Sequence, residues 1–306
     1  MEWLFKIINI PLSYILNFFA GILGNSFAAA VFVFTIFINL ALIPLSIKSQ
    51  KASVGQMRIK PKLDELKRKY GDDKQRYSQE MQKLYQEENI SMGGGCLPTL
   101  IRLPIMFSIY YLITQPLTYL MKIPADVINS VTEALKLEGG NYTRELTIID
   151  AVAKDPSVSP EIANKLGMMD FTLFGLDLTQ TPKFSINIFA NFDPIWFIPL
   201  AAFAAQMLTS VVTMQMQKKI NPDAPNMTGM MLTMPLISLF IGFTVPAGVG
   251  FYWACSSLIS GFIQTGIQYF YGPQKMLAHE RAKEIIKVYE EEQKYISKRV
   301  IDDSDK

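Results

Sequence analysis

Apolar residues are concentrated in five long runs, separated by segments rich in charged and polar residues. The hydrocarbon core of a bilayer is about 30 Å thick and needs about 20 apolar residues of α-helix to cross it. The runs cover residues 28–47, 97–120, 196–214, 227–245 and 248–270. This pattern predicts an all-α polytopic membrane protein with five transmembrane helices.

Basic residues between these runs predict the orientation of the chain. A cluster of Lys and Arg begins at Lys48, directly after the first run, and Lys218 and Lys219 follow the third. Basic residues favour the cytoplasmic side of a membrane. The segment 122–190 holds more acidic than basic residues, which fits the outside. We therefore expect the N-terminus outside and the C-terminus in the cytoplasm.

The segments outside the runs have patterns of their own. Residues 1–23 resemble an amphipathic helix lying in the extracytoplasmic interface, and the alternative is a poor first transmembrane helix. Residues 48–95 carry two apolar stripes at helical spacing around Gly71-Asp72-Asp73, which predicts a cytoplasmic helical hairpin. Its charged faces are either simply solvated or a docking surface for a partner or for anionic lipid. Residues 271–306 form a cytoplasmic tail.

The long extracytoplasmic segment 122–190 is too long to be structureless. Its patterns predict helices at 127–137 and 148–166, and short strands at 171–178 and 184–189. Its role is open.

Composition supports a membrane protein and excludes several kinds of chemistry. Half of the residues are hydrophobic and only 18% are charged, against about 25% in soluble domains. The net charge of +2 carries no argument for nucleic acid, and we expect no direct nucleic-acid partner. The chain has only two cysteines, Cys96 and Cys255, which is too few for a disulfide framework. It has a single histidine, His279, which nearly excludes a histidine-based catalytic or metal centre. We expect no enzyme activity and no cofactor.

Arg102 is the one full charge well inside a predicted span, where an arginine costs about 2.5–3.5 kcal/mol on insertion scales. Its depth is within about 5 Å of that of Asn39 on the first span, at 1.5 Å per helical residue. If further polar residues converge on them, the bundle encloses a water-filled, positively charged cavity open to the cytoplasm. The alternative is that Arg102 reaches the head groups and the hydroxyls bond to their own helices. The candidate groove residues are Arg102, Asn39, Gln206, Thr209, Ser210 and Gln264.

Several motifs, in order, resemble the YidC family of membrane-protein insertases. Ile43-Pro44-Leu45 closes the first run, and residues 71–81 match the hairpin tip of bacterial members. Gly94-Gly95-Cys96-Leu97-Pro98 opens the second run. Residues 234–236, 243–248 and 252–253 are similar to the family hallmarks of spans four and five. The chain looks like the Gram-positive type, except for its long 122–190 segment.

This resemblance implies five transmembrane helices around a hydrophilic groove open to cytoplasm and lipid. It also implies a multi-pass protein of the bacterial cell membrane that inserts nascent membrane proteins into lipid. A groove arginine in span one is thought to attract acidic residues of the client, and the matching position here is Asn39. We expect Arg102 to supply that charge from span two. The ribosome and the Sec translocon are further candidate partners, contacted through the helical hairpin.

Two other functions are compatible with a polytopic membrane protein. A small-solute transporter would predict broken helices and an inverted repeat, and neither is visible in the sequence. A membrane scaffold that translocates nothing predicts that leucine can replace the polar groove residues without loss.

Overall fold

The computed structural model describes residues 2–90, 97–137, 143–184, 193–220 and 228–304. The chain divides into two compact units. The first comprises Met1–Ile43 with Thr99–Ile263, and the second comprises Pro44–Pro98 with Gln264–Lys306. Over the described residues, regular structure is helical apart from one two-stranded β-hairpin, which agrees with the predicted all-α class.

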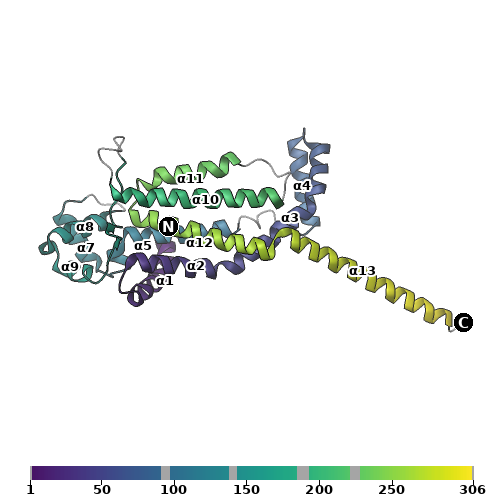
Figure 1. Ribbon diagram of the computed structural model, residues 1–306, viewed down its shortest axis with the longest axis horizontal. Helices are drawn as coiled ribbons and strands as arrows, with labels where there is room; N and C mark the ends of the chain where they lie inside the picture. Colours follow the sequence, from purple (N-terminus) through teal and green to yellow (C-terminus); the bar gives the residue numbers. More distant parts are fainter. Residues whose placement is uncertain (1, 91–96, 138–142, 185–192, 221–227, 305–306) are drawn as a thin grey trace. The chain divides into compact units, whose positions relative to one another are not determined.

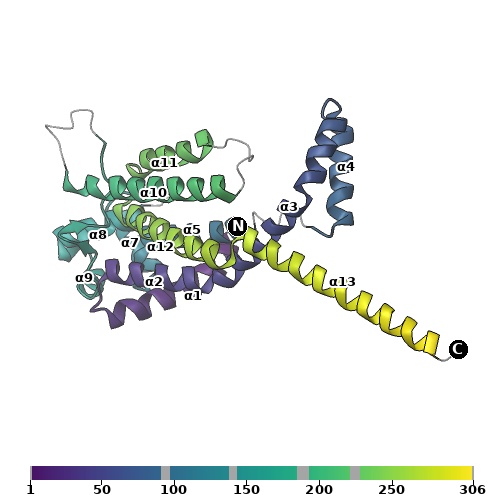
Figure 2. The same ribbon diagram turned by 45° about the vertical axis from the view of Figure 1, so that its right-hand side comes forward.

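The first unit is built mainly from long helices. Helix α1 packs along α2, and α10 packs along α11 (Figures 1 and 2). The side-chain hydroxyl of Ser26 caps α2 by accepting a hydrogen bond from the Ala29 N–H at 3.4 Å. The helices are α1 (Glu2–Ile22), α2 (Phe27–Ala41), α5 (Leu97–Thr114), α6 (Pro116–Tyr119), α10 (Phe197–Ile220), α11 (Thr228–Gly242) and α12 (Ala247–Tyr271), of which α5 begins and α12 ends within the second unit.

Small residues set how closely α12 and α11 approach α10. A Cβ on Gly261 of α12 would lie 2.4 Å from the Cγ2 atom of Thr209 on α10. A Cβ on Gly242 would lie 3.0 Å from the Cβ of Pro199. Glycine at helix crossings lets backbones approach closely. Close packing of this kind favours helix association in membranes, where lipid tails are as apolar as the side chains and the hydrophobic effect does not drive helices together.

The length and hydropathy of the described helices account for fewer spans than the sequence predicts. Pro194–Met216 is long and apolar enough to cross a membrane. A second span is possible if a bent pair of helices counts as one. This pair is Phe27–Ala41 with Ile43–Gln50, bent by 42° at Leu42. Shorter apolar helices cover Ile7–Ile22, Leu103–Thr114 and Met231–Gly242. Five spans therefore stay a prediction.

A small helical insert with its own core follows α6. It consists of α7 (Ala125–Ala134), α8 (Arg144–Lys154), the 3-10 turn η1 (Pro156–Val158) and α9 (Pro160–Leu166). The single helix predicted over 148–166 is wrong, because Pro156 and Pro160 lack the backbone N–H that a helix interior needs. Each proline instead opens a new element. The core consists of Leu117, Ile123, Ile128, Val131, Leu146, Ile148, Ile149, Val152 and Ile162.

Glu145 is a buried carboxylate in this insert. It is only 3% exposed and accepts hydrogen bonds from the Thr118 N–H at 3.0 Å and the Thr118 hydroxyl at 2.5 Å. Burial raises the pKa of Glu145 above the usual carboxyl range, and the bonds from Thr118 offset only part of that rise. The folded state therefore holds its proton to higher pH than the unfolded chain.

This raised pKa predicts a pH dependence of stability. Because the folded state binds more protons, the contribution of Glu145 to stability falls as pH rises from the ordinary carboxyl pKa through the raised one. We expect Glu145→Gln to remove this dependence, since its amide can still accept from the Thr118 N–H and donate to the hydroxyl. We expect Glu145→Ala to cost about 1–2 kcal/mol through lost hydrogen bonds. Thermal unfolding in detergent between acidic and neutral pH measures both, and a pH dependence of Glu145→Gln as large as that of the unaltered chain would contradict the assignment.

A short segment after the insert ties two helix ends together. The strands β1 (Thr172–Leu173) and β2 (Leu176–Asp177) form an antiparallel β-hairpin. At its base, the carbonyl of Asp170 accepts from the Phe27 N–H of α2 at 2.8 Å. The carbonyls of Leu178 and Gln180 accept from Gly248 and Ala247 at the start of α12, each at 2.8 Å. These carbonyls satisfy donors that helix N-termini leave unpaired. The strand predicted at 184–189 lies outside the described residues except for Phe184.

The second unit contains a helical hairpin and a long terminal helix. Helices α3 (Ile43–Tyr70) and α4 (Lys74–Glu87) run side by side, and α13 covers Pro273–Ser304 (Figure 2). The break between α3 and α4 falls at the predicted Gly-Asp-Asp turn, where the Asp73 side chain caps α4 by accepting from the Arg76 N–H. Arg58 and Lys62 on α3 both pair with Glu88 after α4, which joins the open ends of the helical hairpin.

Candidate functional site

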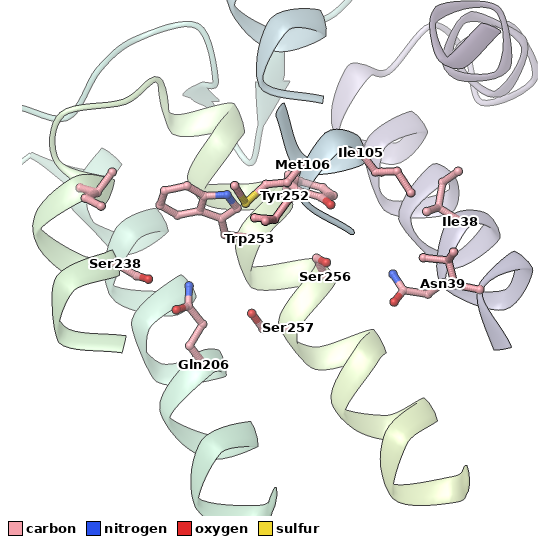
Figure 3. A pocket seen from close by; sticks show the side chains of 13 residues that line it. Ile38, Asn39, Ile105, Met106, Gln206, Ser238, Tyr252, Trp253, Ser256 and Ser257 are labelled. Carbon is pink, nitrogen blue, oxygen red and sulfur yellow. The ribbon is translucent and has the colours of Figure 1, made fainter. Parts of the chain in front are cut away.

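A partly open pocket lies between five helices of the first unit. Its volume is about 400 Å³, and α2, α5, α10, α11 and α12 all contribute side chains to it. Figure 3 shows α2 on one side, α10 and α11 on the other, and α12 between them. The lining residues are Ile38, Asn39, Leu42, Leu103, Ile105, Met106, Gln206, Ser238, Ile241, Tyr252, Trp253, Ser256 and Ser257.

The polar groups of the lining come from opposite walls of the pocket. The amides of Asn39 and Gln206 project from α2 and α10, and the hydroxyls of Ser256 and Ser257 lie between them on α12 (Figure 3). Among the lining side chains that the structure describes, none is charged. Amides and hydroxyls can donate and accept hydrogen bonds, so this lining can exchange bonds with water or with a polar peptide segment.

Local hydrogen bonds orient two of the predicted groove residues. Asn39 is 7% exposed, and its Nδ2 donates to the Thr35 carbonyl one turn earlier at 2.9 Å. That bond directs the amide nitrogen toward its own helix and does not engage Oδ1. The Thr209 hydroxyl donates to the carbonyls of Ala205 and Gln206 at 3.1 and 3.0 Å. Its hydrogen-bond donor is therefore used within α10.

The structure brings some of the predicted groove residues together and separates others. Asn39 and Gln206 both line the pocket, whereas Thr209 and Ser210 are not among its lining residues. Thr209 instead faces Gly261 at the α10–α12 crossing. Gln264 belongs to the second unit, so its position relative to the pocket is not defined. Arg102 lies on α5, but its side chain is outside the described part of the structure.

Four polar lining residues were not among the candidates chosen from the sequence. Tyr252 and Ser256 are one turn apart on α12 and Ser257 is adjacent, so helical spacing carried a signal that they share a face. Ser238 is one of three hydroxyl-bearing residues of α11, with Thr228 and Thr233. No sequence pattern distinguishes it from an isolated hydroxyl that faces its own helix.

An apolar pocket of about 290 Å³ adjoins the polar one. It lies between α5, α11 and α12, and its wall is almost entirely aliphatic and aromatic. The two pockets share Met106, Ile241 and Trp253. A polar surface and an apolar surface therefore meet at one wall within the same unit. The remaining lining residues are Phe107, Tyr110, Tyr111, Val245 and Val249.

No group of three or more His, Cys, Asp or Glu side chains within the described residues could hold a metal ion.

Comparison with known proteins extends the resemblance beyond single motifs. The family model described as 60Kd inner membrane protein matches residues 18–274. Proteins named membrane protein insertase YidC from Rickettsia africae (strain ESF-5), Rickettsia felis and Rickettsia conorii are each 29% identical to the chain over 258 residues. That alignment covers 84% of the chain and 38% of each relative, so the chain spans about two fifths of the length of the curated relatives it matches. Since the family model covers most of the sequence, the chain belongs to the 60Kd inner membrane protein family, the YidC family that its motifs resemble.

Proposed function

We propose that this chain is a membrane protein insertase, which moves short polar tails of client proteins through the polar pocket and releases their hydrophobic helices into lipid. The observation that carries the proposal is the polar pocket joined to an apolar one, in a chain of this family. The relatives' printed name, membrane protein insertase, supports the same activity. A bacterial cell membrane location follows from the proposal.

The proposed topology has five spans, with the N-terminus outside and the C-terminus in the cytoplasm. The basic residues beside the predicted spans support this orientation. In this topology, α3 and α4 form a cytoplasmic helical hairpin. A charged hollow of about 830 Å³ lies between them, with basic and acidic residues on its walls. This surface is the proposed contact for nascent membrane proteins and a candidate contact for the ribosome or the Sec translocon.

The proposed mechanism follows from the cost of moving polar groups through lipid. Transfer of an unpaired amide into an apolar environment costs about 1–3 kcal/mol in proteins. Asn39, Gln206 and the pocket hydroxyls offer replacement hydrogen bonds and lower that cost for a client tail. The apolar pocket beyond Trp253 then receives the hydrophobic part of the client. Burial of that part in lipid, at about 25 cal/mol per Å², drives the step without nucleotide or metal.

Arg102 is the proposed source of positive charge for this pocket. The family resemblance assigns the groove arginine's position to Asn39, five residues before Pro44, and residue counts along the two predicted spans give Arg102 a similar depth. A cation at reduced dielectric attracts carboxylates on a client tail. We expect Arg102→Gln to reduce insertion of an acidic-tailed, single-span client by about tenfold, and Arg102→Gln with Asn39→Arg to restore it. Insertion is measured by protease protection in proteoliposomes. Unchanged insertion by Arg102→Gln would refute this role.

A reconstitution experiment tests the function as a whole. The purified chain in proteoliposomes should insert a single-span client and should show no solute uptake above empty vesicles. Photo-crosslinking groups at Asn39 and Gln206 should capture the client's tail, whereas a group at Thr233 on α11, outside the pocket lining, should not. Solute uptake without insertion would favour a transporter. The absence of both insertion and solute uptake would favour a scaffold.

A further inference from the structure

The tip of the β-hairpin has a phenylalanine, Phe174, at a position with positive φ. Thr172 pairs with Asp177 and Leu173 with Leu176, which leaves a two-residue loop of Phe174 and Gly175. Both loop residues have positive φ, 50° for Phe174 and 81° for Gly175. Two-residue loops with positive φ at both positions strongly favour Asn-Gly, Asp-Gly or Gly-Gly. A bulky side chain at the first position is a backbone outlier.

Phe174 gains almost no burial against the described residues in return for this strain. Its exposed fraction is 98%, the largest among the exposed large hydrophobic residues of the described chain. It is also the only apolar residue among the described non-glycine residues with positive φ, which are Asn25, Asn89, Lys122, Lys136 and Phe174. Strain of this kind persists where surrounding structure maintains it and is often functional. A strained and exposed aromatic residue is therefore a candidate for contact with a partner outside the chain.

Hydrogen bonds hold the base of the β-hairpin, and they locate its tip. Asp170 Oδ1 accepts from the N–H and the hydroxyl of Thr172, both at 2.8 Å. Asp177 Oδ1 accepts from the same groups of Thr179 at 2.9 and 2.7 Å. The base is bonded to the N-terminal ends of α2 and α12, as described above. Four extended residues reach about 13 Å, so Phe174 lies within about that distance of both helix ends.

Other exposed apolar residues flank the attachment of the β-hairpin. Ile22 at the end of α1 is 64% exposed and lies three residues before Asn25, whose carbonyl accepts from the Asp170 N–H. Met168, two residues before Asp170, is 66% exposed. In the same unit, the Lys122 ammonium lies 3.6 Å from the centre of the Tyr14 ring. Aromatic and lysine side chains are typical anchors at the boundary between lipid and water.

We propose that the β-hairpin is a membrane-interface anchor, in which Phe174 inserts among the head groups and upper acyl chains of the leaflet at this end of α2 and α12. The proposal rests on the transmembrane placement of these two helices in the proposed function. Lipid is the partner that the observations favour, because the tip is held beside the ends of two apolar helices and its neighbours are exposed apolar side chains. A lipid contact recovers the apolar burial that the tip lacks among the described residues. It also fixes the height of the helix ends that the β-hairpin joins.

A nitroxide spin label attached at Phe174→Cys tests this anchor. The full chain, with Cys96 and Cys255 replaced by Ala, is reconstituted in vesicles of phosphatidylcholine and phosphatidylglycerol. Collisions with oxygen, which concentrates in acyl chains, should exceed collisions with a water-soluble nickel chelate. The control is a label at Lys154→Cys on α8, whose native side chain is 74% exposed, and it should show the reverse. A label at position 174 with the same water exposure as at 154 overturns the proposal, as does a label immobilised only when a client is added.

A second pair of variants separates the anchor from simple proximity to the membrane. With the label moved to Met168→Cys, Phe174→Asn should lower oxygen accessibility at least twofold, since Asn suits the turn but not lipid. Phe174→Leu should preserve it. Unchanged accessibility in the Asn variant overturns the proposal. If the label at position 174 is aqueous in a chain that still inserts its client, only the anchor fails and the insertase proposal stands. If it lies in lipid in a chain with no insertion activity, the anchor stands without the insertase.

Discussion

Replacing Asn39, Gln206 and Ser257 together by leucine is expected to abolish client insertion while the chain still reaches the membrane. These residues carry polar groups on three walls of the pocket, on α2, α10 and α12. Without them, we expect three amides of the client tail to lose their hydrogen-bond partners in the pocket. At about 1–3 kcal/mol per amide, the free energy of moving the tail through the pocket rises by about 3–9 kcal/mol. Even the lower figure slows insertion by more than a hundredfold. Protease protection of an acidic-tailed client in proteoliposomes measures the loss.

Two controls make this result interpretable. Thr233→Leu on α11 changes an exposed hydroxyl outside the pocket lining, bonded to the Gly229 carbonyl, and should insert clients normally. The conservative set Asn39→Ser, Gln206→Asn and Ser257→Thr should keep most of the activity, because each residue can still donate and accept hydrogen bonds. Normal insertion by the triple-leucine chain would contradict the proposed route and favour a scaffold.

Gly261→Ala is expected to destabilise the chain by about 1–3 kcal/mol and to impair insertion. The new Cβ would lie 2.4 Å from Thr209 Cγ2 and 3.2 Å from Thr209 Cβ, so α10 and α12 have to separate. Thr209 cannot easily turn away, because β-branched side chains are restricted in helices and its hydroxyl is bonded to α10 carbonyls. Gln206 and Ser257 lie one turn from the crossing, so the pocket walls would move as well.

The contact with Thr209 predicts a specific rescue. Thr209→Ser removes the clashing methyl and keeps the hydroxyl, so Gly261→Ala with Thr209→Ser should recover most of the stability and activity. Gly266→Ala is the matched control, since a Cβ there meets nothing within 4 Å and alanine favours helix. Thermal unfolding in detergent and client insertion measure all four chains. A double variant no better than Gly261→Ala would show that the Thr209 contact is not the cause.

The sequence by itself determined the helical class of the protein and several of the turns between its elements. Long apolar runs require burial in lipid or protein whatever the tertiary arrangement, and turn residues such as Gly71-Asp72-Asp73 end helices through local backbone chemistry. The motifs of residues 43–45 and 243–248 identified the family that the comparison then confirmed. The one error within the insert, a helix continued through Pro156 and Pro160, ignored a local signal that the sequence contained.

Only the tertiary structure decided which polar residues share the pocket. Successive helical residues are rotated by about 100°, so the rotation of each helix about its axis determines which side chains face one another. That rotation depends on packing between helices distant in sequence. It turns Asn39 and Gln206 into the pocket with Ser238 and Ser257, and it assigns Thr209 to the crossing with Gly261. The polarity of a residue cannot show whether it lines the pocket or packs at a helix crossing. Both positions are possible on the same helix until the neighbouring helices are in place.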